Sequence, residues 1–370
     1  MYTKSVSIFI LFCCCDEIQR EYRVKQNYRE DRSGVLVSKL GETGLWELAD
    51  YLASDMQVCN RVIVERMRSS VPLISQLVKH LVAAGGKRIR PMLTLASARL
   101  CGHDVSEGQL RRAEIAACVE FIHTATLLHD DVVDESRVRR GLASANAVFG
   151  SKASILVGDF LFARLFQILT IDGSIDVMMI LSHASAALAE GEVMQMTAQN
   201  DLSTSMAQYL QVVQGKTAVL FAAACEVGAV IGGANPEQRE ALRIYGDNLG
   251  MAFQLVDDAL DYVADQEILG KEVGDDFREG KITLPVLVAY ERGNEEDRLF
   301  WHRVIEESHQ EEGDFDHAFQ RIMATDAIGV TLAHAEDYAE KARKALQVFP
   351  DSVLKGLLHK AVDYSIKRKN

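Results

Sequence analysis

The sequence predicts an all-α protein built as one large helical bundle. From about residue 44 onward, apolar residues recur every three or four positions, which is typical of helices that bury one face. Runs in which β-branched and polar residues alternate between hairpin turns are nearly absent, so there is little sign of strands. Only five prolines occur in 370 residues, and this permits long uninterrupted helices.

The expected helices follow one another along the chain and are separated by clusters of Gly, Asp, Asn and Ser, which favour turns and helix ends. Several of them are apolar on more than one face, so we expect other helices to enclose them. No linker divides the series, which predicts a single domain. In order, the apolar segments are Leu45 to Met56, Leu93 to Leu100, Ile115 to Leu127, 153–171, 175–199, 205–231, 236–264, 282–292, 314–348 and 351–367.

The first 36 residues differ from this pattern. An apolar run of eight residues, Ile8 to Cys15, is too short to span a bilayer and has no small-residue cleavage site after it. Residues 16–36 are charged and lack periodicity. We therefore expect residues 1–36 to form a disordered extension and residues 37–370 to form the folded domain.

Composition excludes some classes of function. The formal net charge of −13 argues against nucleic-acid binding, because such proteins need a broad basic face. The seven cysteines include no CxxC pair, so structural zinc and thioredoxin-like chemistry lack support. Scattered cysteines in apolar helices indicate free thiols in a reducing compartment, and we expect a cytoplasmic protein.

A first acidic motif ends the apolar helix that contains Ile115 to Leu127. Asp130, Asp131 and Asp134 have the spacing DDxxD, which places the first and last on one helix face with the second about 100° around. Such close carboxylates repel one another unless a cation holds them. Their hard oxygen atoms suit magnesium, which completes its coordination with water and substrate phosphate.

The same spacing returns in a second motif, Asp257, Asp258 and Asp261, again within an apolar helix. A single DDxxD is most simply a solvated helix end, whereas two copies can face each other across a bundle interior. Basic residues accompany both motifs, and arginine and lysine are the usual ligands of phosphate groups. These basic residues are Lys87, Arg88, Arg90, Arg139, Arg140, Lys216, Lys271 and Lys281.

Taken together, these motifs resemble those of the trans-isoprenyl (polyprenyl) diphosphate synthases. The similarity covers about residues 45 to 368 and is greatest to the bacterial long-chain members that make octaprenyl diphosphate, with decaprenyl and solanesyl enzymes close behind. The resemblance implies an all-α isoprenoid synthase fold with a central cavity. The motifs that carry it are "GGKRIRP", "LLHDDVVDESRVRRG", "GDFLFAR", "KTA", "FQLVDDALDY" and "GDDFREGKITLP".

The resemblance also implies roles for individual residues. About three magnesium ions would be bound on an allylic diphosphate such as farnesyl diphosphate by Asp130, Asp131, Asp134, Asp257, Asp258 and Asp261. The same diphosphate would contact Arg139, Lys216, Thr217, Gln254, Lys271 and Lys281, with Lys216 counted as catalytic. Isopentenyl diphosphate would be held by Lys87, Arg90, His123 and Arg140.

Chain length is expected to be controlled just before the first motif. In this family a large aromatic residue four or five positions upstream of the first aspartate tends to stop growth early, and here those positions hold Thr126 and Ala125. These small residues favour a long product, a side-chain precursor of a respiratory quinone. Phe121 lies one turn further back and could belong to the tunnel wall. The family is typically a homodimer, and its apolar product would pass to a membrane although the enzyme has no stable insertion there.

Other classes of function remain as alternatives. Glu120 with His123, and Glu306 with His309, have the Glu-x-x-His spacing of di-iron bundles. A class I terpene cyclase shares one DDxxD and an all-α interior, but needs neither a second copy nor a second diphosphate site. A non-catalytic subunit of a heteromeric synthase is the third alternative, although both aspartate motifs are intact.

Overall fold

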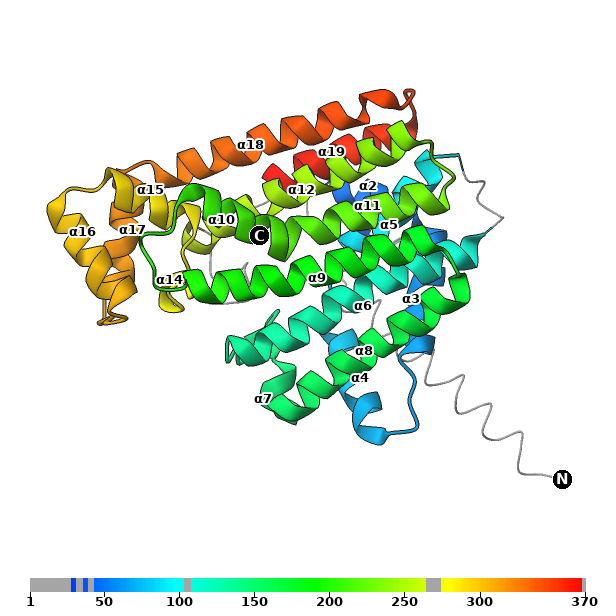
Figure 1. Ribbon diagram of the computed structural model, residues 1–370, viewed down its shortest axis with the longest axis horizontal. Helices are drawn as coiled ribbons and strands as arrows, with labels where there is room; N and C mark the ends of the chain where they lie inside the picture. The colour runs from blue at the N-terminus through cyan, green and yellow to red at the C-terminus, as the bar shows by residue number, and fades with distance from the viewer. Residues whose placement is uncertain (1–27, 31–35, 39–42, 103–107, 264–273, 368–370) are drawn as a thin grey trace.

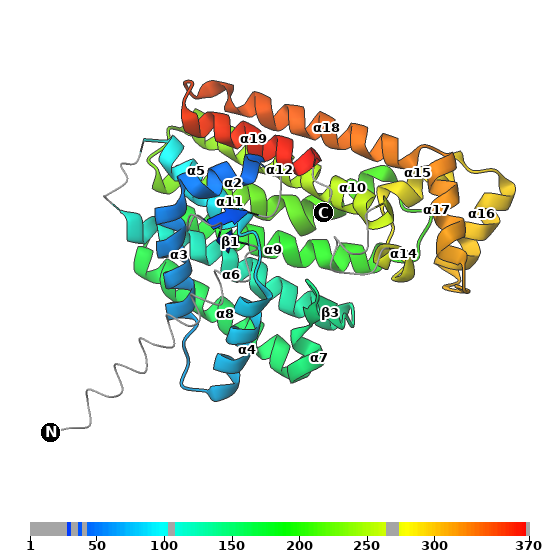
Figure 2. The ribbon, with the colours of Figure 1, turned by 180° about the vertical axis from the view of Figure 1, so that it is seen from behind.

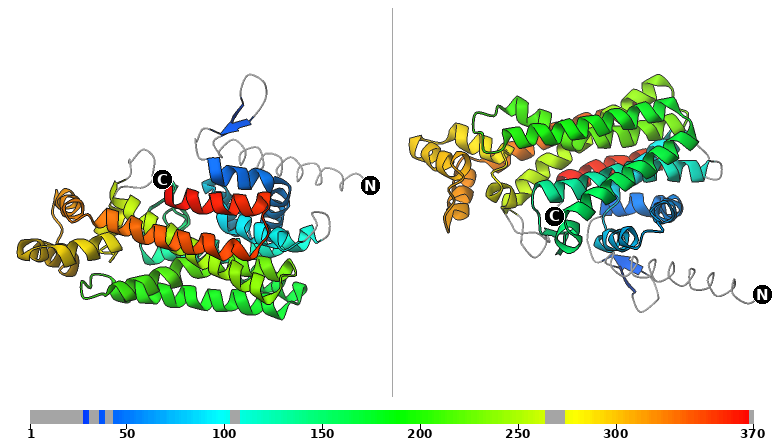
Figure 3. Two further views of the ribbon diagram at one scale, coloured as in Figure 1. Left: turned by 90° about the horizontal axis from the view of Figure 1, so that it is seen from above. Right: turned by 60° about the horizontal axis from the view of Figure 1, so that its bottom comes forward.

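The computed structural model describes residues 28–30, 36–38, 43–102, 108–263 and 274–367 (Figure 1). The predicted all-α class is confirmed. Within the described residues, strands form only two short antiparallel pairs, β1 (Tyr28–Glu30) with β2 (Leu36–Ser38) and β3 (Val138–Arg139) with β4 (Leu142–Ala143). Figure 3 shows most of the long helices running in about the same direction, as in a bundle.

The helices before residue 200 supply the first half of the bundle. They are α2 (Thr43–Tyr51), α3 (Ala53–Arg66), α4 (Pro72–Ala84), α5 (Ile89–Leu100), α6 (Gln109–Val133), α7 (Ala145–Phe149), α8 (Ser151–Asp172) and α9 (Ile175–Ala198). The second half consists of α10 (Met206–Val213), the π-helical turn η1 (Gln214–Ala218), α11 (Val219–Ile231), α12 (Pro236–Val263), α14 (Asp275–Arg278), α15 (Leu284–Arg292), α16 (Glu295–Trp301), η2 (His302–Glu306), α17 (Asp314–Ala324), α18 (Ala327–Ala345), η3 (Leu346–Val348) and α19 (Val353–Lys367).

Helix α11 lies at the centre of the bundle and contacts α5, α6, α9 and α12. Glycines at the helix contacts allow these neighbours to approach closely, because glycine has no side chain. A Cβ atom on Gly228 would lie 2.4 Å from the Thr94 carbonyl oxygen of α5, and one on Gly246 of α12 would lie 2.4 Å from the carbonyl oxygen of Phe221. The expectation that some helices are enclosed by others is therefore confirmed for α11, whose side chains are buried along most of its length.

A buried ion pair joins α3 to the start of α6. Asp55 is fully buried, and its carboxylate lies 2.6 Å from Arg99 of α5 and 3.8 Å from Arg112 of α6. Gln109 also donates a hydrogen bond to it at 3.0 Å. Buried charges are tolerated only when they are paired, so these contacts fix where α6 begins relative to α3 and α5.

Two expected boundaries, in the segment 314–348 and at residues 1–36, are compared with the structure. The segment 314–348 was expected as one helix, and this is wrong, because the backbone turns at Asp326, whose φ is 55°, so that α17 ends and α18 begins there. The disordered extension was expected at residues 1–36. Residues 1–27 lie outside the described residues, whereas Tyr28–Glu30 form β1, so the expectation stays a prediction.

Two helical stretches, Ser151–Asp172 and Met206–Ile231, are long and apolar enough to cross a membrane by length and composition. The core helices of water-soluble bundles meet the same criterion. The second stretch is mostly buried inside the protein, and α8 packs along α6 and α7. Both stretches are therefore explained as bundle helices.

Candidate active site

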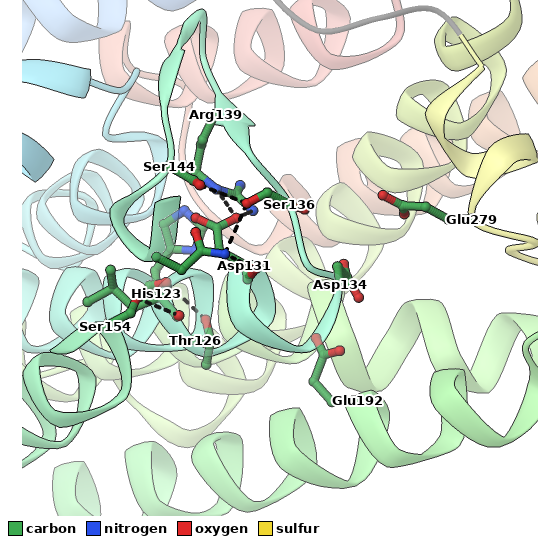
Figure 4. Close-up of polar contacts among 12 residues, drawn as sticks. His123, Thr126, Asp131, Asp134, Ser136, Arg139, Ser144, Ser154, Glu192 and Glu279 are labelled. Atoms are coloured by element: carbon green, nitrogen blue, oxygen red, sulfur yellow. Dashed lines mark hydrogen bonds and ion pairs between the residues drawn. The ribbon is translucent and has the colours of Figure 1, made fainter. Parts of the chain in front are cut away.

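The first aspartate motif lies where α6 ends, beside the β3–β4 hairpin (Figure 4). Asp131 is 2% exposed, and Arg139 of β3 forms an ion pair with it, with Nε 2.7 Å from the carboxylate. The backbone carbonyl of Asp131 accepts a hydrogen bond from the Asn146 side chain at 2.7 Å. The hairpin that carries Arg139 is thus fastened to the motif itself, which agrees with the placement of Arg139 next to the first aspartates.

Asp130 lies in a region of strong negative charge. Burial, together with the nearby carboxylates of Glu192 and Asp134, raises the pKa of Asp130 to about 7, although Lys216 and Arg139 act in the opposite direction. A cation that binds beside a carboxyl group in this environment stabilises its charged form. The charge of this motif is therefore only partly balanced by the protein.

The second aspartate motif lies on α12 and is held by a chain of hydrogen bonds. Tyr209 of α10 donates to one oxygen of the Asp258 carboxylate, and Gln254 donates to the other at 2.7 Å. Thr217 of η1 donates to Gln254 at 2.9 Å. Burial, followed by the charge of Asp276, raises the pKa of Asp258 to about 8 despite these donors.

Lys281 connects the two motifs. Its ammonium group lies 3.2 Å from Asp134 of the first motif. On the side of the second motif, the backbone N–H of Asp276 donates to Asp261 at 3.0 Å, and the Lys281 N–H donates to the Asp276 carbonyl at 2.9 Å. Burial alone would lower the pKa of Lys281, but the charges of Asp276, Asp134 and Glu279 outweigh it and raise that pKa.

Lys216 approaches the first motif from η1. Its ammonium group lies 2.8 Å from Glu192 and 2.6 Å from the side-chain oxygen of Gln195, both on α9. A Cβ atom on Gly191 of α9 would lie 2.6 Å from the backbone nitrogen of Lys216, so glycine is required for the close approach of η1 to α9. Single π-helical turns are frequent at functional sites, and here the turn presents Lys216 and Thr217 together.

A basic cluster, consisting of Lys87, Arg90, His123 and Arg140, forms the other part of the site. Arg90 lies 3.3 Å from the His123 ring nitrogen Nε2 and 4.4 Å from the centre of the Phe221 ring. Burial and the surrounding arginines lower the pKa of His123 well below its usual value, so that the ring is neutral. Burial lowers the pKa of Arg90 to about 10, which leaves it charged near neutral pH.

Comparisons with known proteins agree with this geometry. Residues 71–322 match the family model described as polyprenyl synthetase. The chain is 46% identical to octaprenyl diphosphate synthase of Escherichia coli, over 86% of this chain and 98% of that protein. The chain belongs to the polyprenyl synthetase family.

Solved structures of family members have the same fold. A polyprenyl synthase from Caulobacter crescentus, in complex with calcium and isoprenyl diphosphate, superposes with a TM-score of 0.85 at 48% identity and covers 90% of this chain and 100% of its own. A decaprenyl diphosphate synthase from Rhodobacter capsulatus gives a TM-score of 0.83 at 49% identity, covering 88% of this chain and 99% of its own. The isoprenoid synthase fold expected from the motifs is therefore confirmed.

The remaining expected residues are placed as follows. Ala125 is fully buried in α6, and the hydroxyl of Thr126 donates to the His123 carbonyl within the same helix at 2.9 Å. Arg140 donates to the carbonyl oxygen of Gly85, two residues before Lys87. Lys271 lies outside the described residues.

The structure opposes a di-iron centre. Glu120 forms an ion pair with Arg88 at 2.7 Å, and His123 is engaged by Arg90. The second candidate pair lies at the surface, where Glu306 contacts His302 and His309 is largely exposed. Neither Glu-x-x-His pair therefore presents free ligands to a shared interior site.

Sequence reasoning missed Tyr209 and Glu192 as residues of this site. Both lie near the aspartates only because α9 and α10 pack against α6 and α12, and neither belongs to a local motif. Tyr209 is buried, and the spacing of residues in the sequence does not indicate that its hydroxyl contacts Asp258 of α12. Both residues hold charged groups of the site in place.

The donor set fits magnesium. In the described part of the chain no three carboxylate, imidazole or thiol groups stand close enough to hold a metal ion jointly, because Asp131, Asp134 and Asp258 point to protein donors. The two motifs nevertheless offer hard oxygen atoms in excess. Burial, followed by neighbouring carboxylates, raises the pKa values of Asp130 and Asp258, and a divalent cation would offset both effects.

We predict a pH-dependent stability that magnesium counteracts. Because folding raises the pKa of Asp130 to about 7 and that of Asp258 to about 8, the folded protein binds these protons more tightly than the unfolded chain. This contribution is complete below about pH 4 and is lost as the pH rises through about 7 to 8. In the presence of a chelator, Tm should be lower at about pH 8 than at about pH 5. Magnesium should raise Tm more at the higher pH.

The matched comparison is Asp130→Asn against Asp50→Asn, since Asp50 is an exposed residue of α2. Asp130→Asn should flatten the fall in Tm with pH and reduce the gain from magnesium, whereas Asp50→Asn should do neither. Thermal melts at the two pH values measure both effects. Equal pH profiles for Asp130→Asn and the unmodified protein would contradict the prediction.

Proposed function

We propose that this protein is a long-chain trans-polyprenyl diphosphate synthase that makes octaprenyl diphosphate. It would condense isopentenyl diphosphate repeatedly, head to tail, with an allylic diphosphate such as farnesyl diphosphate. The observation that carries the proposal is the arrangement of the site, in which two aspartate motifs bridged by Lys281 lie near a separate basic cluster. Two diphosphates need two such sites, and the similarity to octaprenyl diphosphate synthase supports the product.

The acidic part of the site would receive the allylic diphosphate. The residues that would hold magnesium are Asp130, Asp131, Asp134, Asp257, Asp258 and Asp261; when bound, the metal supplies positive charge that stabilises the departing diphosphate. Lys216, Lys281 and Arg139, each paired with a carboxylate of the site, would supply positive charge to the same diphosphate. Thr217 and Gln254 would orient it from η1 and α12.

The basic cluster would hold isopentenyl diphosphate so that its double bond faces the allylic carbon. Arg90, Arg140 and Lys87 supply positive charge, and neutral His123 supplies a ring nitrogen without adding further repulsion. The allylic C–O bond breaks, the double bond attacks the resulting cation, and a proton leaves to the released diphosphate. No protein nucleophile takes part. Apolar side chains such as Phe121 and Leu128, which are buried on α6, keep water away from the cation.

The same proposal includes the location of the enzyme in the cell and the destination of its product. The cysteines within the described residues, Cys59, Cys101, Cys118 and Cys225, are free thiols, which supports a cytoplasmic location. The octaprenyl product is too apolar to remain in water, so it would be delivered to a membrane, where it would serve as the side chain of a quinone.

A product-length assay tests the function. The purified protein, magnesium, farnesyl diphosphate and labelled isopentenyl diphosphate should give a ladder of dephosphorylated products that ends at octaprenyl length. Asp130→Ala should lower turnover by a factor of at least about 100, as expected for the loss of charge stabilisation in an active site. A ladder ending at decaprenyl or solanesyl length would correct the product, and a cyclic hydrocarbon or no product would contradict the proposal.

Ala125→Phe should shorten the product. Ala125 is fully buried on α6, one turn before Asp130, so a phenyl ring there would occupy space that the growing chain needs. Chromatography of the dephosphorylated products measures the change. Ala113→Phe is a suitable control, because Ala113 is equally buried on α6 but lies far from the motif. Products of unchanged length from a folded Ala125→Phe enzyme would exclude Ala125 from the tunnel wall.

We also propose a homodimer formed through α8 and α9. Large apolar side chains are exposed on these two helices, among them Leu156 at 66%, Phe166 at 58% and Ile175 at 67%. Large apolar side chains exposed in this number on two helices are typical of an interface, and two-fold homodimers are the commonest oligomers. A second copy of the chain is therefore the expected occupant of this surface.

Leu156→Lys combined with Phe166→Lys should convert the dimer to a monomer, because each buried lysine would need to lose its hydration. Light scattering coupled to size-exclusion chromatography gives the mass directly. Leu299→Lys is the control, since Leu299 of α16 is 65% exposed and lies outside α8 and α9. An unmodified protein that is monomeric, or a dimer that survives the double substitution, would refute this interface.

A further inference from the structure

The C-terminal helix reaches the basic cluster through Tyr364. Helix α19 packs against α2 and α5, the helix that begins just after Lys87 (Figure 2). Tyr364 lies in the last turn of α19 and is 7% exposed. Its hydroxyl accepts a hydrogen bond from the Lys87 ammonium group, which also lies 5.2 Å from the centre of the Tyr364 ring. Tyr364 thus contacts Lys87 through its hydroxyl.

Lys87 needs such support more than the other members of the basic cluster. Arg90 is half-buried and packs against His123 and Phe221, whereas Lys87 is exposed and follows Gly85 and Gly86, which have positive φ angles. A lysine side chain has many rotamers, and fixing it on a ligand costs conformational entropy. A lysine that is held in place before the ligand arrives avoids part of this cost.

We infer that Tyr364 is a positioning residue for isopentenyl diphosphate. It holds the Lys87 ammonium group at the basic cluster, so the C-terminal helix contributes to substrate affinity through Lys87. In this contact the Lys87 ammonium group donates a hydrogen bond to the Tyr364 hydroxyl. The inference rests on the proposed function, in which Lys87 binds this diphosphate.

Tyr364→Phe tests the inference, because it removes the hydroxyl and keeps the ring. KM for isopentenyl diphosphate should rise about three- to tenfold, as expected for one hydrogen bond. The kcat value and KM for farnesyl diphosphate should change by less than about twofold. Tyr364→Leu also removes the hydroxyl and should raise KM for isopentenyl diphosphate to a similar degree. A change of all three constants together would indicate a general structural role and overturn the inference.

Tyr245→Phe is the matched control. Tyr245 of α12 is buried, and its hydroxyl donates a hydrogen bond to the Leu358 carbonyl of α19 at 3.0 Å. This substitution therefore loosens the docking of α19 to a similar degree without touching Lys87. KM for isopentenyl diphosphate should remain unchanged, and a rise equal to that of Tyr364→Phe would show that the docking of α19, and not the contact with Lys87, is responsible.

Lys87→Met separates failure of the inference from failure of the proposed function. If Lys87→Met leaves KM for isopentenyl diphosphate unchanged, the proposed diphosphate site is wrong and the inference falls with it. If Lys87→Met raises KM and Tyr364→Phe does not, the inference alone is overturned. When both raise KM, adding Tyr364→Phe to Lys87→Met should have no further effect, whereas independent, multiplicative effects would contradict the positioning role.

Discussion

The structure depends on keeping two groups of carboxylates close together inside an apolar helical bundle. Burying an ionised carboxylate without a partner is costly, and carboxylates beside one another add repulsion. The protein offsets this cost with partners drawn from all sides of the site. Arg139 comes from the hairpin after α6, Lys216 from the π-helical turn η1, and Lys281 from the segment after α14. The balance is incomplete, since the pKa values of Asp130 and Asp258 remain raised.

The basic cluster shows the opposite imbalance. Burial and the neighbouring arginines lower the pKa of His123 and keep it neutral, and burial works against the charge on Arg90 itself. A bound cation would thus stabilise the aspartate motifs, and a bound anion would stabilise the basic cluster. An electrostatic arrangement of this kind is preorganised, because the protein need not reorganise its dipoles when charge moves between the two parts. Glu120 contributes to the same arrangement by pairing with Arg88 and by favouring the charged form of Arg90.

The sequence was sufficient to predict features that are local. Helix α8 was expected at 153–171 and is found at Ser151–Asp172, because its apolar period and the glycines at its ends lie within one segment. The aspartate motifs were recognised for the same reason. Tyr209 and Tyr364 were missed because each meets its partner only through tertiary packing, from α10 to α12 and from α19 to the start of α5. The turn at Asp326 was also missed, since a left-handed aspartate has no dependable sequence signal.

The π-helical turn η1 explains how two residues of one helical segment, Tyr209 and Thr217, both serve the second aspartate motif. Tyr209 and Thr217 both reach α12, where Tyr209 contacts Asp258 directly and Thr217 contacts it through Gln254. In a regular α-helix, residues with this separation point about 80° apart. The wider turn at Gln214–Ala218 accommodates one extra residue, which gives the two side chains nearly the phase of residues one heptad apart, on a common face. Gly191 of α9 leaves room for that wider turn, because a Cβ atom there would lie 2.7 Å from the carbonyl carbon of Gly215. A glycine on one helix, a π-helical turn on the next and a hydrogen-bond chain to the third therefore act together to hold Asp258 in place.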